Sequence, residues 1–227
     1  MKIGILQAGH TPDDLIHKLG DYDVLYPNLL AGYGFDFQAY PVVDGVFPDA
    51  VTDCDGWLIS GSRYGAYEDH PWIPKLEEFV RDIYADGRPL VGVCFGHQII
   101  AQALGGKVEK YSGGWSVGYT EYDFDGHKVP LNAWHQDQVV KVPEGAEVIA
   151  RTDFCENAAL VYGDKIWSIQ PHPEFTAEFL DGLMKGRGKG IVPDEIMAEA
   201  STKLDRPTAS ADIAAQMAAF FKKERTR

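Results

Sequence analysis

The amino-acid sequence predicts an α/β fold, in which helices cover both faces of a mixed, mainly parallel sheet. Strand and helix signals alternate along the first two-thirds of the 227 residues, which is typical of strands joined by crossover helices. The signals after Glu174 are helical instead. We therefore expect a single domain of residues 1–227, with a core of about residues 1–180 and a C-terminal helical segment of about residues 181–227.

The first part of the chain contains short apolar runs separated by segments with helical spacing. The expected strands cover residues 2–7, 35–43, 56–60 and 89–93. One helix is expected after Pro12-Asp13-Asp14, because acidic residues suit the first turn of a helix. Two further helices are expected over residues 72–85, where apolar residues recur at helical spacing, and over residues 96–104.

From about residue 115 the pattern changes to short, partly alternating segments with Gly and Pro between them. The candidate strands cover residues 118–124, 139–142, 147–151, 158–162 and 166–169. We expect them to add antiparallel pairs to the sheet. Helices are expected over residues 195–204 and 209–223, after a Gly-rich link at residues 186–190 that we expect to be mobile.

Composition excludes several classes of protein. The formal net charge of −13 argues against a general affinity for nucleic acid, which requires a surface that neutralises phosphates. No run of eighteen apolar residues is present, so no membrane span is expected. The apolar start of the chain turns polar at Gln7 and is too short for a signal peptide. We expect a cytoplasmic protein whose three cysteines stay reduced.

Cys94 is the candidate nucleophile. It follows the apolar run at residues 90–93 directly, a helical segment begins after it, and Gly92 and Gly96 flank it. This Gly-x-nucleophile-x-Gly pattern is typical of a sharp strand–turn–helix elbow, where close neighbours must lack bulk. A helix start also favours a thiolate. The alternative is a buried structural cysteine beside glycines that serve helix packing.

His172 and Glu174 are the candidate base and its orienting carboxylate. Prolines on both sides of His172 disfavour helix and predict an extended backbone, in which residues two apart project to the same side. Glu174 can then accept a hydrogen bond from one ring nitrogen, which leaves the other to take the proton of Cys94. The alternative for an isolated His-Pro-Glu segment is a surface loop.

Together these segments resemble the class I, triad-type glutamine amidotransferases over roughly residues 2–175. In that family a Cys-x-Gly-His-Gln helix start, here Cys94 to Gln98, supplies the nucleophile. A downstream Pro-His-Pro-Glu, here Pro171 to Glu174, supplies the base and its partner. The resemblance implies a flavodoxin-like three-layer sandwich and cleavage of a γ-glutamyl amide through a γ-glutamyl thioester, with no cofactor. No metal site is expected, because the histidines lack ligand spacing.

The resemblance also implies further site residues. Backbone N–H groups of Gly61 and Phe95 would form the oxyanion hole. Many members have Gly-Gly-Pro in the loop where this chain has Gly61-Ser62-Arg63, so Ser62 and Arg63 are candidate substrate contacts in place of the usual residues. Gln98 matches a position that contacts the glutamine substrate.

Two other segments are candidate substrate contacts. Gly114, Trp115 and Ser116 lie where members of the family hold the amino-acid end of the substrate. His135 and Asp137 belong to a Trp-His-Gln-Asp segment that resembles a family segment near the active site. The alternative for this second segment is a turn closed by a His–Asp hydrogen bond, and His97 is expected to be structural.

The sequence leaves competing functions open. In the first, the chain is a stand-alone hydrolase of small γ-glutamyl amides or peptides, similar to the γ-glutamyl peptidases in the segments Gly-Ser-x-Tyr-x-Ala-Tyr and Trp-His-Gln-Asp. In the second, it resembles the glutaminase part of GMP synthetases and delivers ammonia to a separate synthetase subunit. A third reading is an inactive regulatory or binding module, which the intact Cys94, His172 and Glu174 disfavour.

Overall fold

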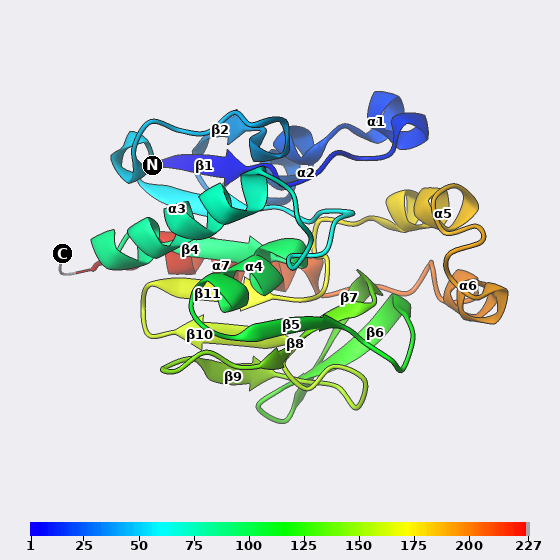
Figure 1. The fold of residues 1–227 in the computed structure, drawn as a ribbon. Helices are drawn as coiled ribbons and strands as arrows, with labels where there is room; N and C mark the ends of the chain where they lie inside the picture. Colours follow the sequence, from blue (N-terminus) through cyan, green and yellow to red (C-terminus); the bar gives the residue numbers. More distant parts are fainter. Residues whose placement is uncertain (226–227) are drawn as a thin grey trace.

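The computed structural model describes residues 1–225 and has a seven-stranded sheet at its centre (Figure 1). Its strands are β1 (Lys2–Leu6), β2 (Asp36–Tyr40), β3 (Gly56–Ile59), β4 (Leu90–Val93), β9 (Glu147–Ala150), β10 (Ala159–Tyr162) and β11 (Ile166–Ile169). In the order β2-β1-β3-β4-β11-β10-β9, the pairings from β2 to β11 are parallel and the last two are antiparallel. The parallel part has the flavodoxin-like order, so the predicted fold class is confirmed.

Helices cover both faces of this sheet. They are α1 (Asp13–Leu19), α2 (Tyr22–Leu29), α3 (Trp72–Asp86), α4 (Phe95–Ala103), α5 (Ala177–Lys185), α6 (Asp194–Ser201) and α7 (Ser210–Lys222), with short 3₁₀ turns at Val42–Asp44 and Val51–Asp53. In Figure 1, α3 and α4 lie in front of the sheet and α7 lies behind it. The last two residues of the expected C-terminal segment lie outside the described residues.

Alternating side chains of the central strands build two separate cores. Leu58 and Val91 pack in one core together with residues of α2 and α7, while Trp57, Ile59 and Leu90 pack in the other with residues of α3 and α4. All five of these side chains are fully buried. Because strand residues point alternately to opposite faces, a strand that is apolar throughout requires a covering layer on each face. This is the three-layer arrangement that the apolar runs predicted.

The expectation that the later strands add to the sheet is only partly right. Strands β9 and β10 do extend it. However, β5 (Lys107–Lys110) pairs with β8 (Asp137–Lys141), and β6 (Ser116–Phe124) pairs with β7 (His127–His135), in two separate two-stranded sheets. The turn between β6 and β7 has positive φ at both Asp125 (48°) and Gly126 (88°), which suits a tight hairpin between long twisted strands. The hairpin packs beside the sheet, and isolated backbone bridges join Asp123 to Arg151 and Asn132 to His172.

Helix α2 was not expected from the sequence. Pro27 lies inside it, and a proline within a segment argues against a helix because proline has no N–H to donate to the preceding turn. For this reason no helix was predicted there. Asp21 begins the helix, since its carboxylate accepts a hydrogen bond from the backbone N–H of Tyr22 at 2.9 Å.

None of the helices described within residues 1–225 combines the length and the apolar character that crossing a membrane would require.

A substitution at Gly96 tests how tightly α4 packs on the sheet. A Cβ atom at residue 96 would lie 2.3 Å from the backbone oxygen of Ile59, so Gly96→Ala must push the helix off β3. We expect a loss of about 3 kcal/mol in the free energy of unfolding, measured in urea.

Gly105→Ala, just beyond the other end of α4, is the matched control. Gly105 has a positive φ, but a Cβ added there would meet no atom within 4 Å, so only backbone strain of roughly 1 kcal/mol is expected. Equal stability of Gly96→Ala and the unsubstituted protein would contradict the close packing.

Candidate active site

Cys94 occupies a sharp turn between β4 and α4. Its backbone has φ 53° and ψ −104°, a strained conformation for a residue other than glycine. The flanking glycines are required by space: a Cβ at Gly92 would lie 2.6 Å from the Gly96 oxygen, and one at Gly96 would meet the Ile59 backbone. The expected elbow is therefore present. It places Cys94 at the carboxyl end of β4, where ligands of parallel α/β sheets bind.

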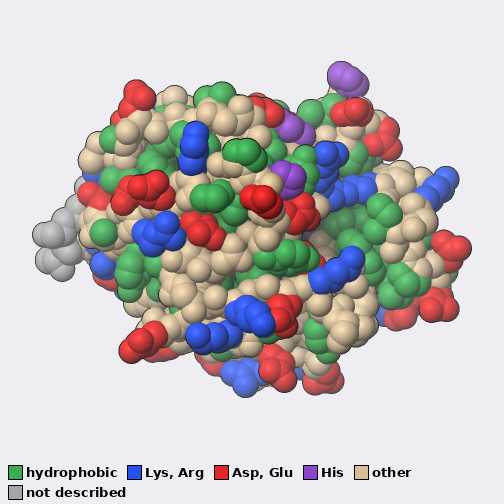
Figure 2. Space-filling view, viewed as in Figure 1, with side chains coloured by type: hydrophobic (Ala, Val, Ile, Leu, Met, Phe, Trp, Pro, Cys, Tyr) green, Lys and Arg blue, Asp and Glu red, His purple; other side chains and the backbone are tan. Residues whose placement is uncertain are grey.

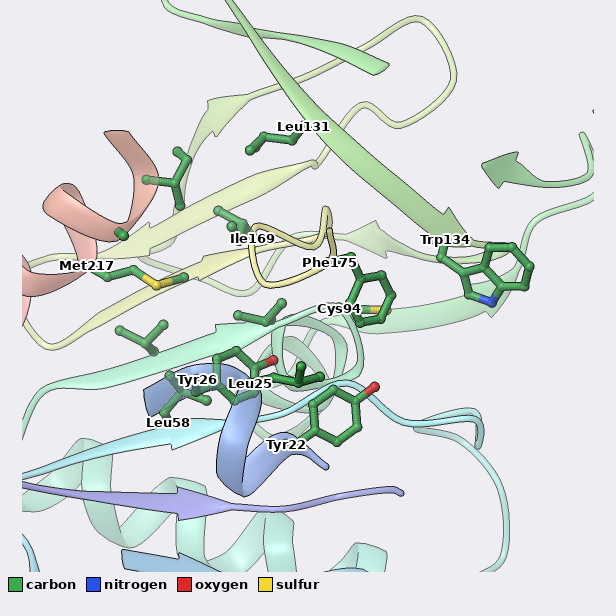
Figure 3. Close-up of a cluster of buried hydrophobic side chains, with 14 of the residues drawn as sticks. Tyr22, Leu25, Tyr26, Leu58, Cys94, Leu131, Trp134, Ile169, Phe175 and Met217 are labelled. Carbon is green, nitrogen blue, oxygen red and sulfur yellow. The ribbon is translucent and has the colours of Figure 1, made fainter. Parts of the chain in front are cut away.

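His172 is held rigidly beside this turn. Its backbone N–H donates to the Asn132 oxygen at 2.8 Å, and the Asn132 side chain donates to the Phe175 oxygen at 2.9 Å. The imidazole stacks on the Phe175 ring with 3.9 Å between centroids and an angle of 4°. Strand β7, which carries Asn132, thus fixes the segment from outside the main sheet. Cys94, Phe175 and Trp134 belong to the same buried cluster, and Figure 3 shows Phe175 over Cys94 with Trp134 to one side.

Glu174 contacts His172, although not by the predicted backbone geometry. The His172 Nδ1 and Glu174 Oε1 atoms are 2.8 Å apart, and both side chains are buried. The extended backbone expected here is wrong beyond His172, because Pro173 and Glu174 form a turn. The Phe175 N–H donates to the His172 oxygen at 3.4 Å and closes this turn. The contact therefore arises because the chain folds back on itself.

Tyr26 holds Glu174 from the opposite side. This fully buried residue of α2 donates its hydroxyl hydrogen to Glu174 Oε1 at 3.1 Å, the same oxygen that faces His172. Burial and the charge of Glu174 raise the pKa of Tyr26 well above its usual value, so the hydroxyl stays protonated. The sequence contained no signal for this contact, because α2 was not expected.

The electrostatics of the cluster favour a charged imidazole. Burial alone lowers the pKa of His172, but the charges of Cys94 and Glu174 and the hydrogen bonds to both side chains outweigh burial and raise it. The imidazolium form of His172 is thereby favoured between Cys94 on one side and Glu174 on the other.

A cavity of about 260 Å³ opens above Cys94 and His172. Lysine and arginine side chains gather beside a hollow on the face shown in Figure 2. The predicted contacts that line the cavity are Gln98, Ser62, Arg63, Trp115, His135 and Asp137. Gly114 and Ser116 are not among the described residues that line it, so their expected role stays a prediction.

Of the two expected oxyanion-hole residues, Phe95 directly follows Cys94 and Gly61 lies beside His172. A Cβ at Gly61 would lie 3.1 Å from His172 Cε1 and 2.9 Å from the Tyr22 hydroxyl, so only glycine lets this loop approach the imidazole. Phe95 is the first residue of α4, and its N–H has no acceptor within the helix. Gln98 is buried one turn further on and donates to the Asp137 oxygen at 2.9 Å and to Gln170 Oε1 at 3.1 Å.

The His–Asp hydrogen bond of the alternative reading is present, but it joins the His135 ring to the backbone of Asp137 and not to its carboxylate. His135 Nδ1 lies 3.3 Å from the backbone oxygen of Asp137, whose carboxylate instead accepts from the Tyr67 hydroxyl at 3.2 Å. Burial, followed by the charge of His172, lowers the pKa of His135 to about 3, so this imidazole stays neutral. Both residues line the cavity.

His97 is directed away from the site. Its Nδ1 lies 2.9 Å from the Ser168 hydroxyl and its Nε2 lies 3.0 Å from the Asn157 oxygen, and the side chain is fully buried. Burial lowers the pKa of His97 to about 4. No cluster of three metal-ligating side chains is found within residues 1–225.

Sequence analysis missed several residues of the cavity wall, including Tyr22, Lys110 and Arg187. Arg187 lies in the Gly-rich link, which forms consecutive turns: the Gly188 N–H donates to the Leu183 oxygen at 2.8 Å and the Val192 N–H to the Gly188 oxygen at 2.9 Å. Nothing in the local sequence indicates that this loop reaches the cavity.

Comparison with known proteins identifies the family. The model of the class-I glutamine amidotransferase family matches residues 31–183. Gamma-glutamyl peptidase 4 of Arabidopsis thaliana is 32% identical, over 75% of this chain and 75% of its own length. A glutamine-hydrolysing GMP synthase of a Thermotoga species is 31% identical over 68% of this chain. The matched region covers only 31% of the length of that enzyme.

A solved structure agrees with the fold. The glutamine amidotransferase of Methylobacillus flagellatus superimposes with a TM-score of 0.75 at 23% identity, over 97% of this chain and 91% of its own. The family match covers most of the chain, and the relatives support hydrolysis of glutamine or γ-glutamyl amides in general. The chain belongs to the class I glutamine amidotransferase family.

Proposed function

We propose that this protein hydrolyses a γ-glutamyl amide bond through a covalent γ-glutamyl thioester, with Cys94 as nucleophile, His172 as acid and base, and Glu174 as the orienting carboxylate. The observation that carries the proposal is the elbow that holds Cys94 against His172, whose other nitrogen lies 2.8 Å from Glu174. In this proposal the catalytic core spans about residues 1–180. The C-terminal helical segment adds Leu183, Arg187 and Ile191 to the cavity wall.

The first half of the reaction forms the thioester. The Cys94 thiolate attacks the γ-carbonyl carbon, a C–S bond forms, and the carbonyl electron pair moves onto oxygen. The N–H groups of Gly61 and Phe95 stabilise this oxyanion. When the carbonyl re-forms, the C–N bond breaks and the imidazolium of His172 gives its Nε2 proton to the departing ammonia or amine.

The second half releases glutamate. His172, now neutral, takes a proton from water, whose oxygen attacks the thioester carbon. The C–S bond breaks and the thiolate of Cys94 returns beside the imidazolium. Glu174 keeps its Nδ1 contact throughout, so the same ring nitrogen faces substrate in both halves.

A panel of γ-glutamyl amides, including glutamine, tests the proposal when it is offered to the isolated protein and the released amines are quantified. Turnover of γ-glutamyl amides without a partner supports a stand-alone hydrolase. The similarity to a GMP synthase favours a second candidate, a glutaminase that delivers ammonia to a separate synthetase. Turnover of glutamine that appears only when a synthetase is added would support this second candidate instead.

Cys94→Ser should abolish turnover, because a hydroxyl is a far weaker nucleophile than a thiolate, while the nearly equal volume leaves the fold intact. We expect at least a 10³-fold loss in the rate of amine release, at an unchanged midpoint of urea unfolding. Cys155→Ala, which changes a buried cysteine outside the cavity lining, is the control and should keep its turnover. Substantial activity of Cys94→Ser would show that the nucleophile is another residue.

Alkylation by iodoacetamide should report the ion pair directly. The raised pKa of His172 means that its positive charge persists above pH 6.5 and is lost only as the pH rises through the raised value. We expect Cys94 to react at pH 6 at least ten times faster than in His172→Ala. Burial raises the pKa of Cys155 to about 12 and also raises that of Cys54, so both should react slowly. Equal rates at Cys94 in the two proteins would exclude a stabilised thiolate.

Glu174→Gln should retain more activity than His172→Ala, because orientation of the imidazole contributes less than proton transfer. In a Ser-His-Asp triad with the same three roles, replacement of the carboxylate costs roughly a hundredfold less in kcat than replacement of the histidine. We expect a similar ratio of kcat values, measured at pH 7.5 with the best amide of the panel. An equal loss in both variants would contradict the ranking.

A further inference from the structure

Arg187 is a charged side chain in the catalytic cavity that the proposed reaction does not use. It lies in the loop after α5 and lines the cavity together with Cys94. The loop is packed closely, since a Cβ at Gly188 would lie 3.0 Å from the Trp134 ring and 2.8 Å from Met197 Sδ. The guanidinium is therefore presented by a well-packed segment of the wall.

No carboxylate neutralises Arg187 within residues 1–225. Its side chain makes none of the ion pairs or hydrogen bonds found among the described residues. Burial, and to a smaller extent the charge of Arg63, lower the pKa of Arg187, so the site disfavours its positive charge. A guanidinium is too basic to lose that charge at neutral pH, and a bound anion would relieve the cost.

The acidic side chains of the cavity are already engaged elsewhere. Glu68 accepts from the Gly65 N–H at 2.8 Å and lies 2.9 Å from His70 Nε2. Asp137 accepts from the Tyr67 hydroxyl. Three basic side chains line the cavity (Arg63, Lys110 and Arg187) and two acidic ones do (Glu68 and Asp137), so basic side chains outnumber acidic ones there, although the whole chain carries −13. A positive local field attracts anionic ligands.

The two arginines lie where the catalytic cavity continues outward. A second cavity of about 780 Å³ shares Arg63, Arg187 and Ile191 with the first but is not lined by Cys94. Lys110 lines only the catalytic cavity. The second cavity is also lined by Asp13, Asp14 and Asp44, so a carboxylate that extends from Cys94 is favoured at the shared border beside the two arginines and not further out.

We propose that Arg187, together with Arg63, binds the carboxylate of an amino-acid or peptide leaving group, so that the preferred substrates are γ-glutamyl peptides with a free C-terminal carboxylate. This inference rests on the proposed γ-glutamyl hydrolysis. It assigns Arg187 to specificity for the leaving group, because a planar guanidinium can hold a carboxylate by two parallel hydrogen bonds.

Binding of two matched ligands tests the site independently of turnover. γ-Glutamylalanine and γ-glutamylalaninamide share the γ-glutamyl group and differ only in the terminal carboxylate. In the full-length Cys94→Ser protein, we expect calorimetry to show roughly 10- to 100-fold tighter binding of the acid. In Cys94→Ser with Arg187→Gln, this ratio should fall below about threefold, mainly through weaker binding of the acid.

Lys189→Gln is the control, because it removes one positive charge from the same loop at an exposed residue that does not line either cavity. It should leave the ratio unchanged. The carboxylate site is overturned if the acid and the amide bind equally to Cys94→Ser, if Arg187→Gln leaves the ratio unchanged, or if it weakens both ligands equally. Turnover by the unsubstituted protein is measured separately: if it hydrolyses none of the γ-glutamyl amides of the panel although the binding ratio holds, the proposed function fails and the carboxylate site stands.

Discussion

The close approach of α4 to β3 at Gly96 is the constraint on which the site depends. Only a residue without Cβ lets the helix begin directly against the Ile59 backbone, and this contact forces the chain to turn within the single residue Cys94. The positive φ of Cys94 is the strain that results. In return, the sulfur lies at the start of a helix and at the carboxyl end of the sheet, where charge is stabilised and ligands have access.

A buried charged cluster beside this turn requires support from the rest of the fold. Removing His172 and Glu174 from water carries a large desolvation cost, which mutual attraction offsets only if hydrogen-bond geometry is good. The neighbours of this pair supply that geometry: Asn132 holds the backbone, Phe175 supports the ring and Tyr26 donates to the carboxylate. These three residues belong to β7, to the turn after β11 and to α2, so the pair is oriented by segments that are remote in the sequence.

The charge of the cavity differs from that of the whole molecule. An acidic chain repels anions at long range, yet the three basic side chains that line the cavity, Arg63, Lys110 and Arg187, outnumber its two acidic ones. Screening by salt shortens the range of the net charge to about 8–10 Å, so a ligand inside the cavity responds mainly to these nearby groups. Recognition in such a pocket is therefore a local property, which the overall charge does not predict.

The sequence by itself determined the α/β class, the strands and helices around Cys94, and the pairing of His172 with Glu174, because each depends on neighbours within a few residues. It did not predict α2, whose Pro27 hides the helical pattern, or β7, although Asp125-Gly126 is a hairpin signal. Only the tertiary structure decided that Tyr26 meets Glu174 and that Arg187 reaches the cavity. Tyr26 and Glu174 are more than a hundred positions apart in the sequence, and Arg187 lies in a Gly-rich loop. The packing of whole layers brings these residues to the site, and no local sequence pattern encodes that packing.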